Sequence, residues 1–106
     1  MFQIEPGTFK RTVDINVPTE DGSEVQTVEI TYNVMPVSRA KALDTGQDVE
    51  DFVHDSVAKI EGLVDEKKKP LPWSPEVEAK FWDLPFTFNP VRDKYAESIN
   101  EARAKN

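Results

Sequence analysis

The stretch FKRTVDINVPTEDGSEVQTVEITYNV, residues 9–34, decides the fold because apolar and polar side chains alternate along both of its halves. A period of two is typical of a strand with one face buried and the other in water. The halves are joined by a polar loop in which Asp21-Gly22 suits a tight turn. The side chains expected on the inward face are Phe9, Arg11, Val13, Ile15 and Val17, followed by Val28, Ile30, Tyr32 and Val34. We therefore expect an antiparallel β-hairpin with one apolar face.

A two-stranded hairpin is only marginally stable in water when it stands alone. Its apolar face must therefore pack against helices, or another chain must complete its edge. The second option makes a homo-oligomer a reasonable expectation, because an unpaired edge strand presents free backbone N–H and C=O groups.

The chain beyond the hairpin is typical of helices. Ser38 can cap a short helix that reaches about Asp44 and is ended by Gly46. Apolar residues then recur at helical spacing and form a stripe about 140° wide. These residues are Val49, Phe52, Val53, Val57, Ile60 and Val64. We expect one amphipathic helix over residues 48–64, packed on the core.

Two further helices are expected near the C-terminus. Ser74 can cap a helix that has Pro75 at its first position and ends near Asp83, before Pro85. The last helix is expected from about Asn89-Pro90, with Val91, Tyr95, Ile99 and Ala102 on one face. Strands at one end of the chain and helices at the other indicate an α+β protein.

The fold class we expect is thus an N-terminal antiparallel β-hairpin packed against three to four α-helices. At 106 residues the chain has room for one modest core. We expect a single domain, residues 1–106, with a β-hairpin part (1–36) and a helical part (37–106).

The composition excludes several classes of protein. The chain has no cysteine, so it has neither a disulfide framework nor a thiolate zinc site. A net charge of -7 disfavours a nucleic-acid partner, and the run Lys67-Lys68-Lys69 is interpreted as a solvated loop. No apolar run approaches the roughly 20 residues of a membrane span, and the N-terminal sequence lacks a signal-peptide pattern. We expect a cytoplasmic protein without a membrane partner.

No residues suggest a catalytic or metal site, and no cofactor is expected. His54 could pair with Asp51 or Asp55, but a surface histidine among carboxylates is the better interpretation. The acidic residues of segment 48–55 are interpreted as the solvated face of a helix. Neither a glycine-rich phosphate loop nor a nucleophile motif is present. These observations indicate that the protein is not an enzyme, although a small metal-dependent enzyme using Asp and Glu remains an alternative.

The most apolar segment, FWDLPFTF (residues 81–88), is the candidate functional site. It has two interpretations. Its apolar side chains can close the open end of the core, or they can form a surface for a protein partner, since aromatic residues dominate interface hot spots. The candidate partner-binding residues are Phe81, Trp82, Leu84, Phe86 and Phe88. Pro85 and Pro90 would make such a surface rigid.

The whole layout resembles the tail assembly chaperones of long-tailed bacteriophages. The resemblance covers the hairpin with its DG turn, the VEDFV helix (49–53), the WSPE helix start (73–76) and a last helix ending in ARAKN (102–106). It implies a non-enzymatic protein of the host cytoplasm that binds the tape-measure protein and keeps it soluble during tail assembly. It also implies that a frameshifted longer form can recruit the tail-tube protein. The alternative is a structural virion component, such as a tail terminator or head–tail connector protein.

Overall fold

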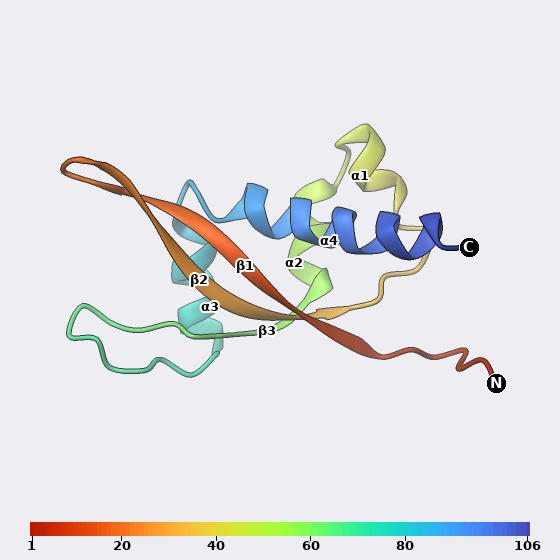
Figure 1. Cartoon of the computed structure of the whole chain (residues 1–106), viewed down its shortest axis with the longest axis horizontal. Helices are drawn as coiled ribbons and strands as arrows, with labels where there is room; N and C mark the ends of the chain where they lie inside the picture. Colours follow the sequence, from red (N-terminus) through yellow and green to blue (C-terminus); the bar gives the residue numbers. More distant parts are fainter.

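The computed structural model describes all residues, 1–106, and has the α+β fold that the sequence predicts (Figure 1). The strands are β1 (Thr8–Thr19), β2 (Gly22–Asn33) and β3 (Val57–Glu61). The helices are α1 (Lys41–Thr45), α2 (Val49–Ser56), α3 (Pro75–Asp83) and α4 (Phe88–Ala104). The strands form one antiparallel sheet in the order β1-β2-β3. No helix is both long and apolar enough to span a membrane.

The predicted β-hairpin is confirmed. β1 and β2 pair continuously from Thr8 opposite Asn33 to Thr19 opposite Gly22, so only two residues form the turn. Gly22 has a φ of 134°, a backbone conformation that glycine adopts without steric cost. Most of the predicted inward side chains are buried or half-buried, but those of Arg11 and Val34 are exposed. The alternating pattern therefore marks the core face along most of both strands.

The single helix predicted for residues 48–64 is wrong beyond Ser56. α2 ends there, and Val57 has the extended backbone that begins β3. β3 pairs with β2, and Ile60 is fully buried opposite Ile30. Val64, which was expected on the helical stripe, is 50% exposed outside the strand.

The physical reason for this strand lies outside the segment itself. The second edge of β2 offers unpaired backbone groups, and a segment that bonds to them satisfies donors and acceptors on both strands. β-branched residues such as Val57 and Ile60 suit a strand better than a helix. The chain itself therefore completes the hairpin, with a strand inside the part that was expected to be helical (37–106).

The remaining helices follow the prediction more closely. α1 begins at Lys41 rather than next to Ser38, and its N-cap residue Ala40 makes no side-chain capping bond. It ends at Gly46, which has the expected positive φ of 75°. α3 and α4 begin and end close to the predicted residues, although Ala102, predicted on the inward face of α4, is exposed.

The core is centred on aromatic rings between the sheet and α4. The rings of Phe9 and Tyr32 stack with their centroids 5.3 Å apart, and Tyr95 of α4 lies 5.6 Å from Tyr32. The Tyr32 hydroxyl donates a hydrogen bond of 2.8 Å to the carbonyl of Val91. The ring of Phe52 from α2 meets Tyr95 edge-on. α2 and α4 therefore pack on the same face of the sheet.

The opposite face of the sheet is charged. Lys10, Glu29, Lys59 and Glu61 form a surface network with N–O distances between 3.3 and 3.7 Å. A hydrogen bond with Glu29 is the main cause of a raised pKa for Lys10, and one with Lys59 is the main cause of a lowered pKa for Glu61. These shifted pKa values belong to a network of exposed ion pairs.

The two ends of the hairpin have different surroundings. At the hairpin base, Glu29–Tyr32 of β2 lie between β1 and β3. At the hairpin tip, residues 14–27, β2 has only β1 as a neighbour. The tip projects from the body of the protein, whose longest dimension is 47 Å (Figure 1). Gly62, with a φ of 89°, turns the chain away from β2 at the border between the two.

Candidate partner-binding site

The apolar segment 81–88 forms the tight connection between α3 and α4. The Ser74 hydroxyl accepts a bond from the N–H of Val77 and caps α3, whose C-cap Leu84 is extended before Pro85. Thr87 is buried, and its hydroxyl lies 2.8 Å from the Phe81 carbonyl and 3.1 Å from that of Leu84. The single hydroxyl proton is thus shared between two backbone carbonyls, and this contact fixes the shape of the turn.

The five predicted site residues have different roles. Phe81 is only 5% exposed and belongs to the core. Trp82, Phe86 and Phe88 are half-buried, whereas Leu84 is 44% exposed. The segment therefore closes the core with one side chain and presents another to solvent.

Two hollows meet at Leu84. The hairpin hollow, about 200 Å³, lies between the hairpin, the start of the β3–α3 connection and the α3–α4 connection. Its apolar lining is Ile15, Val17, Val28, Leu63, Val64, Phe81, Leu84 and Phe86. The helix hollow, about 300 Å³, lies between α2 and the same connection and is lined by Val49, Glu50, His54, Trp82, Leu84, Pro85 and Phe88. Every predicted site residue lines at least one hollow, and only Leu84 among them lines both.

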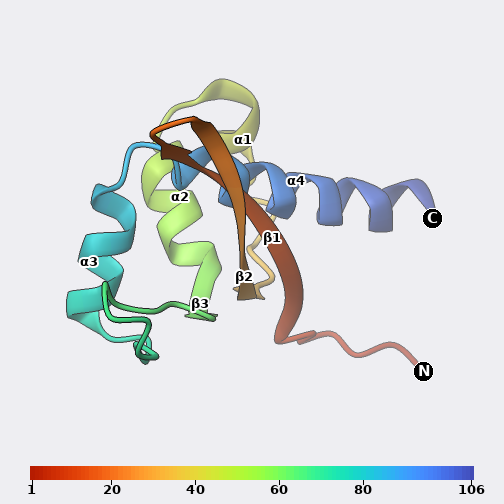
Figure 2. The same cartoon turned by 60° about the vertical axis from the view of Figure 1, so that its left-hand side comes forward.

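His54 was expected to be a surface histidine, but its ring packs against the site. α3 lies beside α2 (Figure 2), and the imidazole stacks on the indole of Trp82 at a centroid distance of 4.3 Å. The ring of Phe88 meets the imidazole edge-on at 6.5 Å. The Trp82 indole N–H is buried and has no hydrogen-bond partner. The sequence alone does not indicate this stack, because it depends on how α2 and α3 pack.

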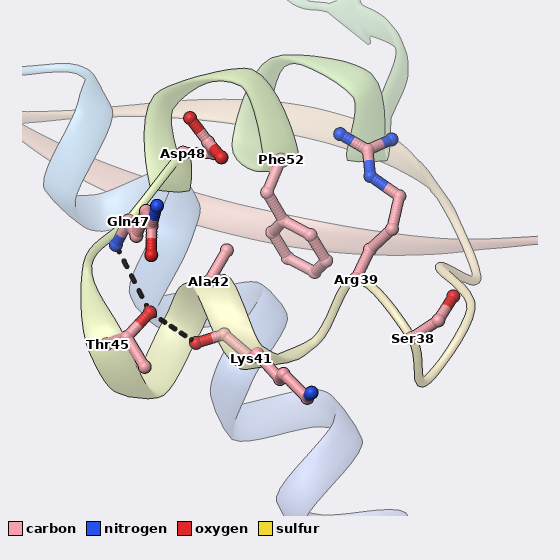
Figure 3. Close-up of a pocket in the computed structure, with 8 residues that line it drawn as sticks. All are labelled: Ser38, Arg39, Lys41, Ala42, Thr45, Gln47, Asp48 and Phe52. Atoms are coloured by element: carbon pink, nitrogen blue, oxygen red, sulfur yellow. Dashed lines mark hydrogen bonds between the residues drawn. The ribbon is translucent and has the colours of Figure 1, made fainter.

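A further hollow, about 360 Å³, lies between α1 and α2 (Figure 3). Arg39 is bonded to Asp55 at 2.8 Å. The Thr45 hydroxyl donates to the carbonyl of Lys41 and accepts from the N–H of Gln47. The polar groups thus serve the local backbone and an ion pair. Nowhere in the chain do three His, Asp or Glu side chains gather closely enough to hold a metal ion.

The basic run in the β3–α3 connection is an exposed loop. The Asp65 carboxylate accepts hydrogen bonds from the backbone N–H groups of Lys67 and Lys69. The three lysine side chains are exposed and make no ion pair within the chain. The lysines therefore lie in a solvated loop.

Comparisons with protein-family models, curated proteins and solved structures gave no match for this chain. The function proposed below rests on the two hollows around Leu84.

Proposed function

We propose that this protein is a non-enzymatic tail assembly chaperone of a long-tailed bacteriophage. It binds the tape-measure protein in the host cytoplasm and keeps this partner soluble until the tail tube forms around it. The observation that carries the proposal is the position of Leu84, a 44% exposed leucine between two hollows with apolar walls. The overall layout of the sequence supplies the identity of the partner through its resemblance to this family.

The geometry suits binding to an apolar stripe on a helix. A helix that lies in a groove inserts a few apolar side chains spaced three or four residues apart. The two hollows offer places for such side chains on either side of Leu84. The turn that holds Leu84 is fixed by Thr87, so little conformational entropy is lost when a partner binds.

The test is co-expression of the tape-measure protein with the wild-type chain, with Leu84→Ala or with a control. Leu84→Ala should weaken binding by about 1–2 kcal/mol, or roughly 5- to 30-fold in Kd, because part of a leucine side chain no longer leaves water on binding. The soluble fraction of the tape-measure protein should fall accordingly.

Val37→Ala is the matched control, because Val37 is 87% exposed and lines neither hollow. It should leave the soluble fraction unchanged. Thermal melts of both variants show whether folding is intact. If a normally folded Leu84→Ala variant protects the tape-measure protein as well as the wild type does, the proposed site is wrong.

A further inference from the structure

We propose that the site around Leu84 selects a helix whose apolar side chains are flanked by Lys or Arg. This inference rests on the proposed function, since it takes the two hollows to be a protein-binding site. It adds the charge of the partner, which the apolar lining alone does not specify. The argument comes from the two walls of the site.

The first wall, the hairpin tip, carries only negative charge. No Lys or Arg occurs between Arg11 and Arg39. The acidic residues of the tip are Asp14, which lies on the outer face and accepts a hydrogen bond from Thr27, and Glu20, Asp21 and Glu24. Glu24 lies opposite Val17, which lines the hairpin hollow, and its carboxylate contacts only the amide of Gln26 within the chain. None of these four carboxylates forms an ion pair.

The second wall, α2 and the turn before it, has the same character. No Lys or Arg occurs between Lys41 and Lys59. Its acidic residues are Asp48, Glu50, Asp51 and Asp55, of which only Asp55 is paired, with Arg39. Glu50 lines the helix hollow directly. No Lys or Arg lines either hollow, although the exposed loop with Lys67, Lys68 and Lys69 follows Val64 of the hairpin hollow. Arg92, which lies over the ring of Phe88 beside the helix hollow, is bonded to Asp93.

An apolar track between two walls of unpaired carboxylates attracts positive charge. The like charges on each wall repel one another, and Lys or Arg side chains beside the apolar anchors of a partner would relieve that repulsion. Such complementarity raises the association rate and excludes acidic competitors more than it raises affinity. Because the walls are exposed, the effect must weaken with salt, as the screening length falls from about 10 Å at 0.1 M to about 3 Å at 1 M.

The test uses two synthetic amphipathic helices of about 18 residues, or five turns, with the same leucine pattern. One carries Lys and the other Glu at the polar positions. We expect calorimetric titration of the full chain at low salt to show at least tenfold tighter binding of the Leu/Lys peptide, a preference that shrinks as salt is added. Leu84→Ala should weaken this binding.

A pair of double variants distinguishes the effect of the charges on the two walls from the effect of the net charge of the whole protein. Glu24→Lys with Glu50→Lys reverses one charge on each wall, whereas Glu97→Lys with Glu101→Lys makes the same change on the part of α4 that points away from the hairpin tip (Figure 1). We expect the wall variant to lose about ten times more affinity for the Leu/Lys peptide than the α4 variant loses. Melting curves confirm that both variants fold.

Three outcomes would overturn these ideas, and they are distinguishable. Equal losses in the two double variants would show that the peptide responds to net charge alone, which overturns the inference. Equal binding of both peptides, weakened in each case by Leu84→Ala, would also overturn the inference but would support the proposed function. Binding that does not change with Leu84→Ala would overturn the site itself.

Discussion

The hairpin base and the hairpin tip are built from the same two strands with the same alternating pattern, yet they differ in what surrounds them. At the base, β3 pairs with the second edge of β2, and Ile30, Tyr32 and Ile60 are fully buried. At the tip, β2 has one neighbour, its inward-facing Glu24 and Gln26 are exposed, and Val25, on the opposite face, is 60% exposed. The alternating pattern determines which face of the sheet a side chain occupies, whereas the elements packed around that side chain determine how much stability it contributes. The base holds the fold together, and the tip forms one wall of the candidate site.

The largest effect is expected at the base. Ile30→Ala removes a fully buried side chain between β1, β3 and the helices, and should lower the free energy of unfolding by about 2–5 kcal/mol, as large-to-small core substitutions do. Denaturant unfolding measures it. A loss below 1 kcal/mol would mean that the base is no more important to stability than the tip.

A smaller effect is expected at the border between the two regions. Gly62→Ala places a side chain at a φ of 89°, and the left-handed conformation costs about 1–2 kcal/mol for a residue with a Cβ. The nearest atoms to the added Cβ are 3.7 Å away, so backbone strain rather than a clash is the cause. Gly7, which lies before β1, also has a positive φ, so Gly7→Ala is the reference variant. If Gly62→Ala lowers the melting temperature more than Gly7→Ala does, the position at the end of β3 adds to the cost of the strain.

Tyr32→Phe isolates one polar contact in the base. The ring stays and the hydrogen bond to the Val91 carbonyl is lost, so the free energy of unfolding should fall by about 1 kcal/mol. Chemical denaturation at neutral pH measures the change. An unchanged stability would show that the Val91 carbonyl, which also belongs to a helix, does not need the hydroxyl.

The same tyrosine predicts a pH dependence. Burial raises the pKa of Tyr32 well above its ordinary value of 10, and burial also raises the pKa of Tyr95. The native phenols therefore keep their protons at a pH where those of the unfolded chain ionise. The contribution of the two tyrosines to stability should be constant below about pH 9 and fall as the pH rises above 10. Tyr32→Phe should reduce the slope of that fall, whereas an identical slope would assign the effect to other groups.

The smallest effect is expected at the tip. Val25→Ala changes a side chain that is 60% exposed on the outer face of the sheet, beside Asn16, and should alter stability by less than about 0.5 kcal/mol. Native-state hydrogen exchange should show the matching contrast, with amides of the tip exchanging faster than those of the base. Equal protection of Val25 and Ile30 would remove the distinction between the two regions.

The parts of the fold that sequence predicts are those decided by neighbouring residues. The hairpin follows from alternation and an Asp-Gly turn, and α3 follows from a serine cap and a proline at its first position. β3 could not be predicted in this way. Val57 and Ile60 also fit the spacing of an amphipathic helix, and the open edge of β2 that makes them a strand is more than twenty residues away in the sequence.

The same limit applies to the candidate site. Composition was enough to find residues 81–88, because a run of aromatic residues and leucine beside prolines is unusual in an acidic chain. The contribution of His54 was missed, and so was the position of Leu84 between two hollows. Both depend on packing between α2, α3 and the hairpin, which no local pattern specifies.

The stack of His54 on Trp82 gives the site an optical signal of its own. The fluorescence of an indole changes when an imidazole ring stacks on it. A side chain that enters the helix hollow and disturbs the stack should therefore alter the fluorescence of Trp82. The chain contains one other tryptophan, Trp73, whose nearest aromatic partner is Phe81 in the core. With Trp73 replaced by phenylalanine, the remaining tryptophan emission would come from the helix hollow alone, and occupancy could be followed in real time without any attached dye.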